Sequence, residues 1–483
     1  MLNGAEIHPP VAGGQAIPQG ILGLPFPGKG HQYALIHVPR GYVGPPISTV
    51  GVLKLFYTII DMGQNNGLGA VVDKSIPLLI DTLQLGKLKA VKHANGRDWW
   101  VLVPEAYTNN IYRILFDPEG FRVMGKQTIG SKLYPGAGQA DFSPDGFRYA
   151  IFDTYNSSMP DAVDVYDFDR CTGLLSNPRH FELWISSYAG GLTFSPNSRY
   201  LYVHTSLVVA QYDLEAPDLE ASRVEVAWYD GYESPFPTHF FAGQLAPDGK
   251  IYISTSNGTD VLHVIHRPDE AGVACMLEQH GIRVPTYNAT SMPNFPNYRL
   301  GPLDGSPCDT LDLDNHPVAW WRYEQDTLNP LWIEFRDLSY YEPTYWHWDF
   351  GDGSTSSERH PVHIFGKEGV YQVCLIVGNA NSADTLCRTL YLGVSAQENP
   401  VLQSQVQVTP NPFRDRLSVA LSTNLRSPKF TLYDQAGRLV LTEQLAYGVT
   451  MLDTWGLPRG MYFWEVLSDC RTVKTGKLVK VPE

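Results

Sequence analysis

The sequence lacks any run of eighteen apolar residues, so it predicts no transmembrane helix. Its first residues, MLNGAEIHPPVAGG, contain neither a basic segment nor an apolar segment and do not resemble a secretory signal peptide. Charged residues make up 18% and apolar residues 43% of the 483 positions, which is an ordinary balance for globular domains. At roughly 100–200 residues per domain, this length predicts about three domains.

Basic residues are too few and too scattered for a nucleic-acid-binding surface. The net charge is −14 with a pI near 5.4, and no Lys/Arg cluster is present that could neutralise phosphates. From Gln405 to the C-terminus, however, ten Lys and Arg stand against seven Asp and Glu, so this segment carries about +3 and the remainder about −17. We therefore expect the C-terminal segment to be a separate module and no nucleic-acid partner.

Linear signatures of catalysis and of metal binding are also missing. The six cysteines form no CxxC pair, so no zinc site is predicted, and disulfides formed in an oxidising compartment are the alternative. The sequence contains no GxSxG, HExxH or Walker-type motif. No catalytic, cofactor-binding or metal-binding residue is predicted, and no cofactor is expected.

Turn-forming residues are abundant. The sequence contains 43 Gly and 36 Pro, and aromatic residues make up 12% of it, including 27 Tyr and 11 Trp. Long helices do not tolerate so many helix-breaking residues, whereas aromatic residues favour strands. The composition therefore predicts an all-β protein of short strands joined by frequent turns.

A turn motif recurs through the first three hundred residues. Asn95, Asp145, Asn197 and Asp248 are spaced by 50, 52 and 51 residues, and a strand-like segment follows each of them. In FSPDG and APDG, Pro fixes φ, Asp accepts local hydrogen bonds and Gly supplies a positive φ. A repeat of this length predicts four-stranded propeller blades. The motif resembles the SPDG turns of YVTN- and WD-type β-propellers.

The beginning of the propeller is harder to place. A weaker unit has strands at Gln32–Val38 and Leu53–Thr58, which makes five units in all. Two explanations remain open for ring closure: extra strands near Gly281–Pro296, or a gene product that extends upstream of Met1. We favour the upstream extension, because residues 1–30 resemble a loop and export requires a signal peptide.

The segment between Trp320 and Val394 resembles a PKD domain, an immunoglobulin-like sandwich. The string YWHWDFGDG, then HPVHIF, then GVYQVCL carry the resemblance. The expected structural residues of the motif are Trp348, Asp349, Phe350, Gly351, Asp352, Gly353, His363 and Tyr371. His360 with His363 has a spacing that could bind a metal, and Asp349 with Asp352 could bind calcium, but structural roles are favoured for both pairs.

A disulfide is predicted within this domain. Cys374 and Cys387 lie symmetrically about the hairpin loop Asn379–Ser382, and alternation places both on the outer face of their strands. Opposed residues on neighbouring strands have Cβ atoms about 4.5–5.5 Å apart, close to disulfide range. The pairing of Cys171, Cys275 and Cys308 is left open by the sequence.

The C-terminal segment resembles the type A sorting domain of the type IX secretion system of Bacteroidota. Four motifs stand in family order, namely PNPF, LYDQAGR, LPRGMYFW and GKLVK. The expected signal residues are Pro410, Asn411, Pro412, Phe413, Asp434, Gly437, Arg438, Leu457, Pro458, Gly460, Gly476, Lys477, Leu478, Val479 and Lys480. The resemblance implies recognition by the secretion translocon and its sorting peptidase, and attachment to surface lipopolysaccharide.

Together these patterns predict a propeller-like region (1–317), a PKD domain (318–394), a linker (395–404) and a sorting domain (405–483). We expect a non-catalytic secreted or cell-surface protein. Its propeller would bind an extracellular glycan or protein ligand, and its PKD domain would act as a spacer or adhesion module. The alternative is an exported propeller enzyme, lactonase-like or glycan-active. Carboxylates or histidines converging in the channel would favour the enzyme, whereas an aromatic mouth would favour binding.

Overall fold

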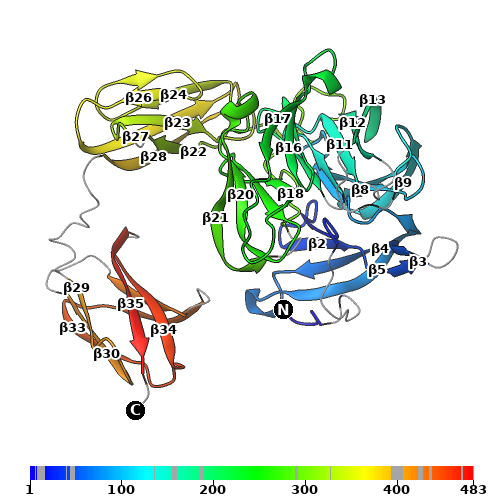
Figure 1. The fold of residues 1–483 in the computed structure, drawn as a ribbon. Helices are drawn as coiled ribbons and strands as arrows, with labels where there is room; N and C mark the ends of the chain where they lie inside the picture. The colour runs from blue at the N-terminus through cyan, green and yellow to red at the C-terminus, as the bar shows by residue number, and fades with distance from the viewer. Residues whose placement is uncertain are drawn as a thin grey trace.

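The structure is a computed structural model. It describes residues 1–5, 7, 17–39, 41–43, 49–134, 136, 138–154, 160–184, 190–288, 292–326, 328–392, 406–421, 428–434, 438–468 and 471–481. Within these residues the protein is all-β, as the composition predicts (Figure 1). Helical structure in this part of the chain is limited to three 3-10 turns, at Asn65–Gly67, Glu220–Ser222 and Gly272–Cys275.

The propeller region contains five sheets with four successive antiparallel strands each, and the first sheet carries the additional short strand β3 (Gly41–Val43). The first and second sheets contain β1 (Ile21–Pro25), β2 (Gln32–His37), β4 (Thr49–Asp61) and β5 (Ala70–Leu83), and then β6 (Lys89–Lys92), β7 (Trp99–Pro104), β8 (Asn110–Asp117) and β9 (Gly120–Thr128). The third and fourth sheets contain β10 (Gln139–Phe142), β11 (Arg148–Asp153), β12 (Asp161–Asp169) and β13 (Leu174–Leu183), and then β14 (Gly191–Phe194), β15 (Tyr200–His204), β16 (Val208–Asp213) and β17 (Val224–Trp228). The fifth sheet contains β18 (Phe240–Leu245), β19 (Ile251–Thr255), β20 (Thr259–Ile265) and β21 (Leu277–Asn288). Each sheet is one blade of the predicted β-propeller, numbered 1 to 5 in chain order.

The repeated turns join the first and second strands of blades 2 to 5. In blade 3 the Asp145 carboxylate accepts hydrogen bonds from the Ser143 hydroxyl and the Phe147 N–H. Gly146 has a φ of +77°, as the motif predicts, and Ser198 occupies the equivalent position of blade 4 with a φ of +60°. The sequence repeat therefore corresponds to the blade repeat.

The N-terminal region differs from the expectation that residues 1–30 form a loop. Ile21–Pro25 is the first strand of blade 1, and it pairs along its whole length with β2, Ile21 opposite His37 and Pro25 opposite Tyr33. Leu22 and Leu24 of this strand are fully buried. The alternating pattern is short and flanked by Gly and Pro, so the sequence signal for this strand is weak.

Apolar clusters fill the spaces between successive blades, from blade 1 against blade 2 through to blade 4 against blade 5. After β21 the chain returns along the inner strands, and we call residues 292–303 the return segment. Asn294 Nδ2 donates to the backbone oxygens of Ile21 and Leu88, and the Tyr298 hydroxyl donates to that of Gly23. The return segment therefore connects blade 1 to the start of blade 2 by side-chain hydrogen bonds.

The PKD region is a sandwich of two sheets. One contains β22 (Trp321–Gln325), β23 (Trp332–Asp337) and β26 (Val362–Ile364), and the other contains β24 (Tyr345–Asp349), β25 (Thr355–Ser356), β27 (Gly369–Gly378) and β28 (Ala383–Leu392). Its core is aromatic: Trp321 and Trp348 have no exposed surface and pack edge to face, with ring centroids 5.6 Å apart. Such pairs stabilise a core beyond the area that they bury.

The C-terminal region is a second sandwich. Its sheets are β29 (Val406–Thr409), β30 (Arg416–Leu421) and β33 (Gly448–Asp453), and β31 (Lys429–Tyr433), β32 (Leu439–Gln444), β34 (Gly460–Ser468) and β35 (Arg471–Lys480). Alternating residues such as Leu417, Val419, Phe430 and Leu432 fill the space between them. The predicted linker, residues 395–404, lies outside the described residues.

Candidate functional sites

Two glutamine side chains connect the innermost strands at the centre of the propeller. Gln139 of β10 donates to the Gly243 carbonyl at 2.7 Å and accepts from the N–H groups of Gly243 and Leu192. Gln19 pairs in the same way with Ala140, at 2.7 and 2.9 Å. The amide groups thus satisfy backbone donors and acceptors that the inner strand edges would otherwise leave open.

Two buried carboxylates of blade 3 are each paired with a lysine. Lys89 Nζ lies 3.0 Å from Asp141 Oδ1, and Lys87 Nζ lies 2.9 Å from Asp153 Oδ1. All four side chains are at most one-tenth exposed. Burial raises the pKa of Asp141 and of Asp153, since the charged form loses hydration, and the lysines oppose this effect. These groups hold neighbouring blades together.

One histidine lies near the same centre. The Nδ1 of His204 is 3.2 Å from the Phe241 carbonyl, which can only accept, so Nδ1 carries the proton. Its Nε2 is buried and has no partner within the described residues. Burial lowers the pKa of His204 to about 3, so the ring is neutral at physiological pH. His263, also buried, adds to the lowering of this pKa.

Exposed aromatic side chains of blades 3, 4 and 5 lie at the same end of the propeller. Successive strands are antiparallel, so the connections from the fourth strand of each blade to the next blade all lie at one end. Four strongly exposed aromatic residues in or beside these connections are Trp184, Trp228, Phe236 and Tyr287, whose exposed fractions are 80, 56, 55 and 68%. Phe295, after β21, is 54% exposed. Tyr232 belongs to the same connection as Phe236, and its ring lies 4.2 Å from that of His280. We call this set the aromatic face.

The opposite end of the propeller contacts the PKD domain. Arg322 of β22 donates to the carbonyl oxygens of Asp248 and His266, in turns of blade 5. Arg267 of the propeller forms an ion pair with Glu334 of β23, which also pairs with Arg336. These contacts come from the end at which the SPDG-type turns lie, so they leave the aromatic face uncovered by the PKD domain.

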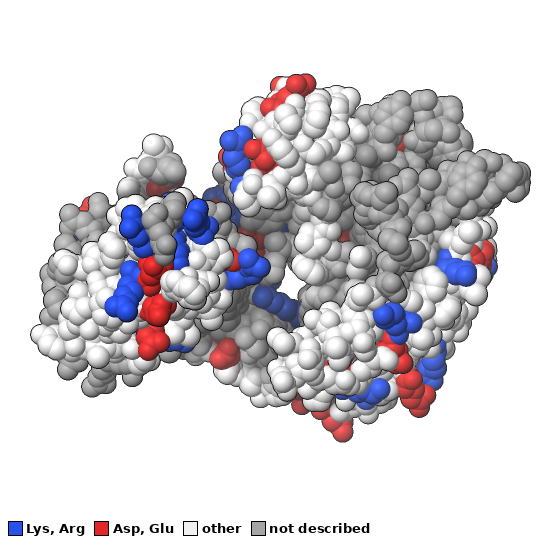
Figure 2. All heavy atoms as spheres, turned by 90° about the horizontal axis from the view of Figure 1, so that it is seen from below, with Lys and Arg blue, Asp and Glu red and all other residues white. Residues whose placement is uncertain are grey.

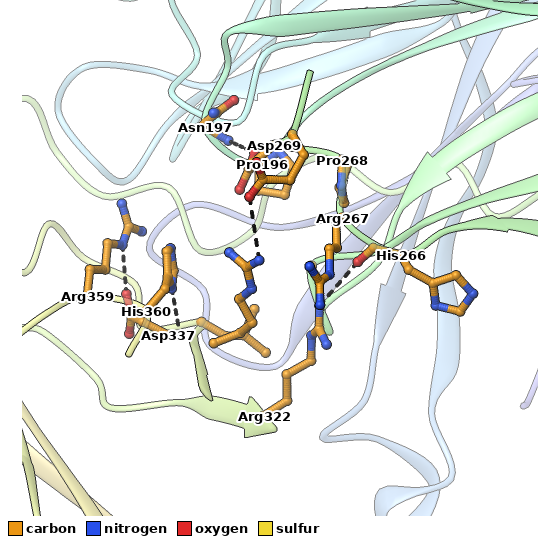
Figure 3. Close-up of a pocket in the computed structure, with 14 residues that line it drawn as sticks. Pro196, Asn197, His266, Arg267, Pro268, Asp269, Arg322, Asp337, Arg359 and His360 are labelled. Atoms are coloured by element: carbon orange, nitrogen blue, oxygen red, sulfur yellow. Dashed lines mark hydrogen bonds and ion pairs between the residues drawn. The ribbon is translucent and has the colours of Figure 1, made fainter. Parts of the chain in front are cut away.

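A pocket of about 310 Å³ lies at this contact (Figure 3). Pro196, Asn197, Gly249 and the 266–270 loop of the propeller form one wall, and PKD residues form the other. Its charged and titratable lining residues are Arg267, Arg322, Arg336, Arg359, His266, His360, Asp269, Glu270 and Asp337. We call it the interdomain pocket. Nothing in the sequence marks it, because its two walls lie 52 residues or more apart, from Glu270 to Arg322 at the nearest.

The PKD motif residues have structural contacts. Trp348 and Phe350 are in the core, and Tyr371 donates to the Lys367 carbonyl. Asp349 accepts from the Gly351 N–H and Asp352 from the Ser354 N–H, while Gly351 and Gly353 have positive φ. His363 stacks on Phe350 at 4.1 Å and bonds to Asp352. Among the residues that the structure describes, no group of three or more His, Cys, Asp or Glu could hold a metal ion.

The predicted disulfide between Cys374 and Cys387 is present. The two residues are directly opposed in the β27–β28 register, with Cα atoms 4.0 Å apart. A second disulfide, Cys171–Cys308, links blade 3 to the chain that follows the return segment. Cys275 is free and buried. Sequence reasoning left this second pairing open because 137 residues separate the two cysteines.

In the C-terminal sandwich the first and last sequence motifs meet. Asn411 Nδ2 donates to the Lys477 carbonyl, and its Oδ1 accepts from the Val479 N–H, both at 3.0 Å. Phe413 is fully buried, and its N–H donates to the Val479 carbonyl. PNPF is therefore held against GKLVK, although 66 residues separate Asn411 from Lys477.

The third motif lies between the second motif and the last strand: Phe463 and Trp464 pair with Tyr433 and Leu432 on one side and with β35 on the other. Lys480 is buried and donates to the carbonyl oxygens of Thr454 and Trp455, just before Leu457. Pro458 accepts a hydrogen bond from the Tyr462 hydroxyl. In the second motif, Arg438 pairs with the Asp434 carboxylate. The remaining predicted residues are placed as follows: Gly476 and Leu478 on β35, Gly460 at the start of β34, and Gly437 outside the described residues.

On the face in Figure 2, Lys and Arg lie beside Asp and Glu. Among the described residues, no helix has the length and apolar character needed to cross a membrane. A shallow groove beside Pro410 and Pro412 is also lined by Arg414, Asp415 and Arg416.

Comparisons with known proteins identify the two C-terminal domains. Residues 324–394 match the PKD domain family, and residues 407–481 match the family described as secretion system C-terminal sorting domain. The collagenase ColQ1 of Bacillus cereus (strain Q1) is 36% identical over 63 residues, which are 13% of this chain and 6% of the collagenase.

Two solved structures show weaker likeness. The PKD1 domain of Vibrio anguillarum Epp is 28% identical, with a TM-score of 0.16, and the match covers 17% of this chain and 99% of that one. PorZ, a surface component of the type IX secretion system of Porphyromonas gingivalis, is 10% identical, with a TM-score of 0.19. The match covers 94% of this chain and 80% of PorZ. The chain is thus a secreted or cell-surface modular protein with a PKD domain and a C-terminal type IX secretion sorting domain.

Proposed function

We propose that this protein is a non-catalytic surface-binding protein whose aromatic face is the binding platform. The observation that carries the proposal is the placement of Trp184, Trp228, Phe236 and Tyr287 at one end of the propeller, each more than half exposed. Exposed aromatic residues in a group are typical of interaction sites, because they bury a large area at little entropic cost.

The polar groups around the aromatic face suit a hydroxylated ligand. Asp230 pairs with His280 at 2.8 Å, and the Trp228 indole N–H donates to Glu225. These contacts fix the orientation of the aromatic rings and leave their faces available for stacking on a sugar ring or a partner's apolar side chain. The extracellular ligand that we propose is a glycan.

The central channel supports the non-catalytic part of the proposal. Asp141 and Asp153, two buried carboxylates of blade 3, are each paired with a lysine, and the glutamines bond to backbone. Sequence reasoning set converging acids or histidines as the mark of an enzyme, and an aromatic mouth as the mark of binding. In this proposal the PKD domain acts as a spacer, and the sorting domain directs surface attachment through the sorting peptidase, with lipopolysaccharide as the anchor.

A screen of the full chain on an array of extracellular glycans tests the proposal. Binding should be lost in the triple variant Trp184→Ala/Trp228→Ala/Phe236→Ala and retained in Tyr391→Ala, which removes an equally exposed ring from the PKD domain. Equal binding by both variants would contradict the assignment of the aromatic face. Turnover of a lactone or glycan by the wild-type chain would contradict the non-catalytic part.

A further inference from the structure

We propose that the interdomain pocket is a second binding site, for one acidic sugar residue of an extracellular polysaccharide. The site lies at the propeller end opposite the aromatic face, so it is independent of the function proposed above. Both domains contribute to it, which means that it exists only when the PKD domain is docked on the propeller (Figure 3).

The pocket presents hydrogen-bond donors that the protein itself does not use. Arg267 Nε is buried and has no acceptor among the described residues. Arg336 forms both of its ion pairs through Nη2, with Glu334 and Glu270, so its Nε and Nη1 stay available within the described part of the chain. A planar carboxylate or a sulfate group matches guanidinium donors of this kind.

His360 adds a neutral donor. Its Nδ1 accepts from the Asp337 N–H at 3.1 Å, so the proton of the neutral ring is on Nε2. Burial, together with Arg359, Arg336 and Arg322, lowers the pKa of His360 to about 3. Burial is the larger cause of this low pKa, and the three guanidinium groups add to it.

Asp269 distinguishes a sugar acid from a simple anion. One carboxylate oxygen accepts from the Asn197 N–H at 2.9 Å, and the other makes no bond within the described residues. A carboxylate repels a bare phosphate or sulfate but accepts hydrogen bonds from sugar hydroxyls. Pro196, Pro268 and Leu338 add apolar surface for the ring, and about 310 Å³ lies at the lower end of the volumes found for ligand pockets.

Calorimetric titration of the full chain with glucuronic acid, galacturonic acid, glucose and sodium sulfate tests the proposal. We expect binding of a uronic acid and none of glucose. Arg267→Lys keeps the charge opposite Glu334 but removes the Nε donor, and it should weaken binding about tenfold. Asp269→Asn, which keeps an acceptor for the Asn197 N–H, should weaken uronic-acid binding but not sulfate binding.

Arg122→Gln is the matched control, because Arg122 pairs with Asp117 in blade 2, whereas the propeller wall of the pocket comes from blades 4 and 5, and it should bind like the wild type. Thermal unfolding of each variant shows that it is folded. Equal affinity for glucose and uronic acid would overturn the proposal, as would sulfate binding that matches uronic-acid binding in every variant. The aromatic-face triple variant should keep this binding, which separates the two sites.

Discussion

The carboxylate of Asp141 lies 3.0 Å from the Nζ of Lys89, and the two residues stand on the innermost strands of neighbouring blades. Lys89 also donates to the Phe295 carbonyl in the return segment. Its ammonium group therefore joins blade 2, blade 3 and the return segment at a point from which water is largely excluded. A buried charge of this kind is stable only while its partner is present.

Replacing Lys89 with Met should destabilise the propeller by about 3–5 kcal/mol, because Asp141 then keeps a buried charge without a partner. The measurement is the free energy of unfolding in urea at pH 7. Lys54→Met, at an exposed position of β4, is the control and should change little. The double variant Lys89→Met/Asp141→Leu should recover much of the loss, and a double variant no better than Lys89→Met would contradict this account.

Stability should fall as the pH is lowered from 7 to 5. Burial lowers the pKa of His204 to about 3 and that of His263 to about 4. In the unfolded chain a histidine has a pKa of about 6.5. The unfolded state thus binds more protons below that pH, and the native state loses about 1.4 kcal/mol per histidine for each pH unit.

The variant His204→Gln should take up about one proton fewer on unfolding than the wild type, so its unfolding free energy should depend less steeply on pH. The midpoints of urea unfolding at pH 7 and pH 5 measure this difference. His316→Gln, at an exposed position, is the control and should leave the slope as it is in the wild type. A slope that does not change in His204→Gln would mean that His204 is not the buried neutral group that its contacts indicate.

Cys374→Ser should lower the stability of the PKD domain by roughly 3 kcal/mol, since the disulfide closes a loop of about fourteen residues. Peptide mapping without reduction should recover Cys374 with Cys387 and Cys171 with Cys308. Cys470 lies outside the described residues, and we expect it to be unbonded, because a bond upstream would tether the sorting domain after its removal. A Cys470 peptide linked to Cys275 or Cys308 would contradict that expectation.

Deleting residues Thr475–Glu483 in a host with type IX secretion should retain the protein in the periplasm. The deletion removes the part of β35 that holds Asn411 and Phe413, so the PNPF motif loses its partner. Cell fractionation and surface labelling measure the effect. Normal surface display of the truncated chain would contradict the assignment of the sorting signal.

A point variant tests whether export requires the folded sorting domain or only its linear sequence motifs. A Cβ at Gly476 would lie 2.7 Å from the Trp464 ring, so Gly476→Val should unfold the sorting sandwich and block export. Gly456→Val is the matched control, because nothing lies within 4 Å of a Cβ at that position, and it should be exported. Export of both variants at the wild-type level would show that the translocon reads a linear motif.

The sequence by itself determined the features that depend on local chemistry. Turn residues at Asp145 and Gly146 require particular φ values, so the blade repeat is visible as a spacing. Alternation along β27 and β28 places Cys374 opposite Cys387, so that disulfide follows from the register of one hairpin. The motifs of the two sandwiches are likewise runs of turn and core residues, which identify each domain without any long-range contact.

Tertiary structure alone decided which distant groups meet. The Cys171–Cys308 bond, the pairing of Gln19 with Ala140 and the interdomain pocket join segments that no periodicity relates. Arg267 and Arg336 look like ordinary surface residues in the sequence, yet docking of the PKD domain brings them to one pocket. Such sites leave no linear signature, because their geometry is set by how blades and domains pack rather than by neighbours along the chain.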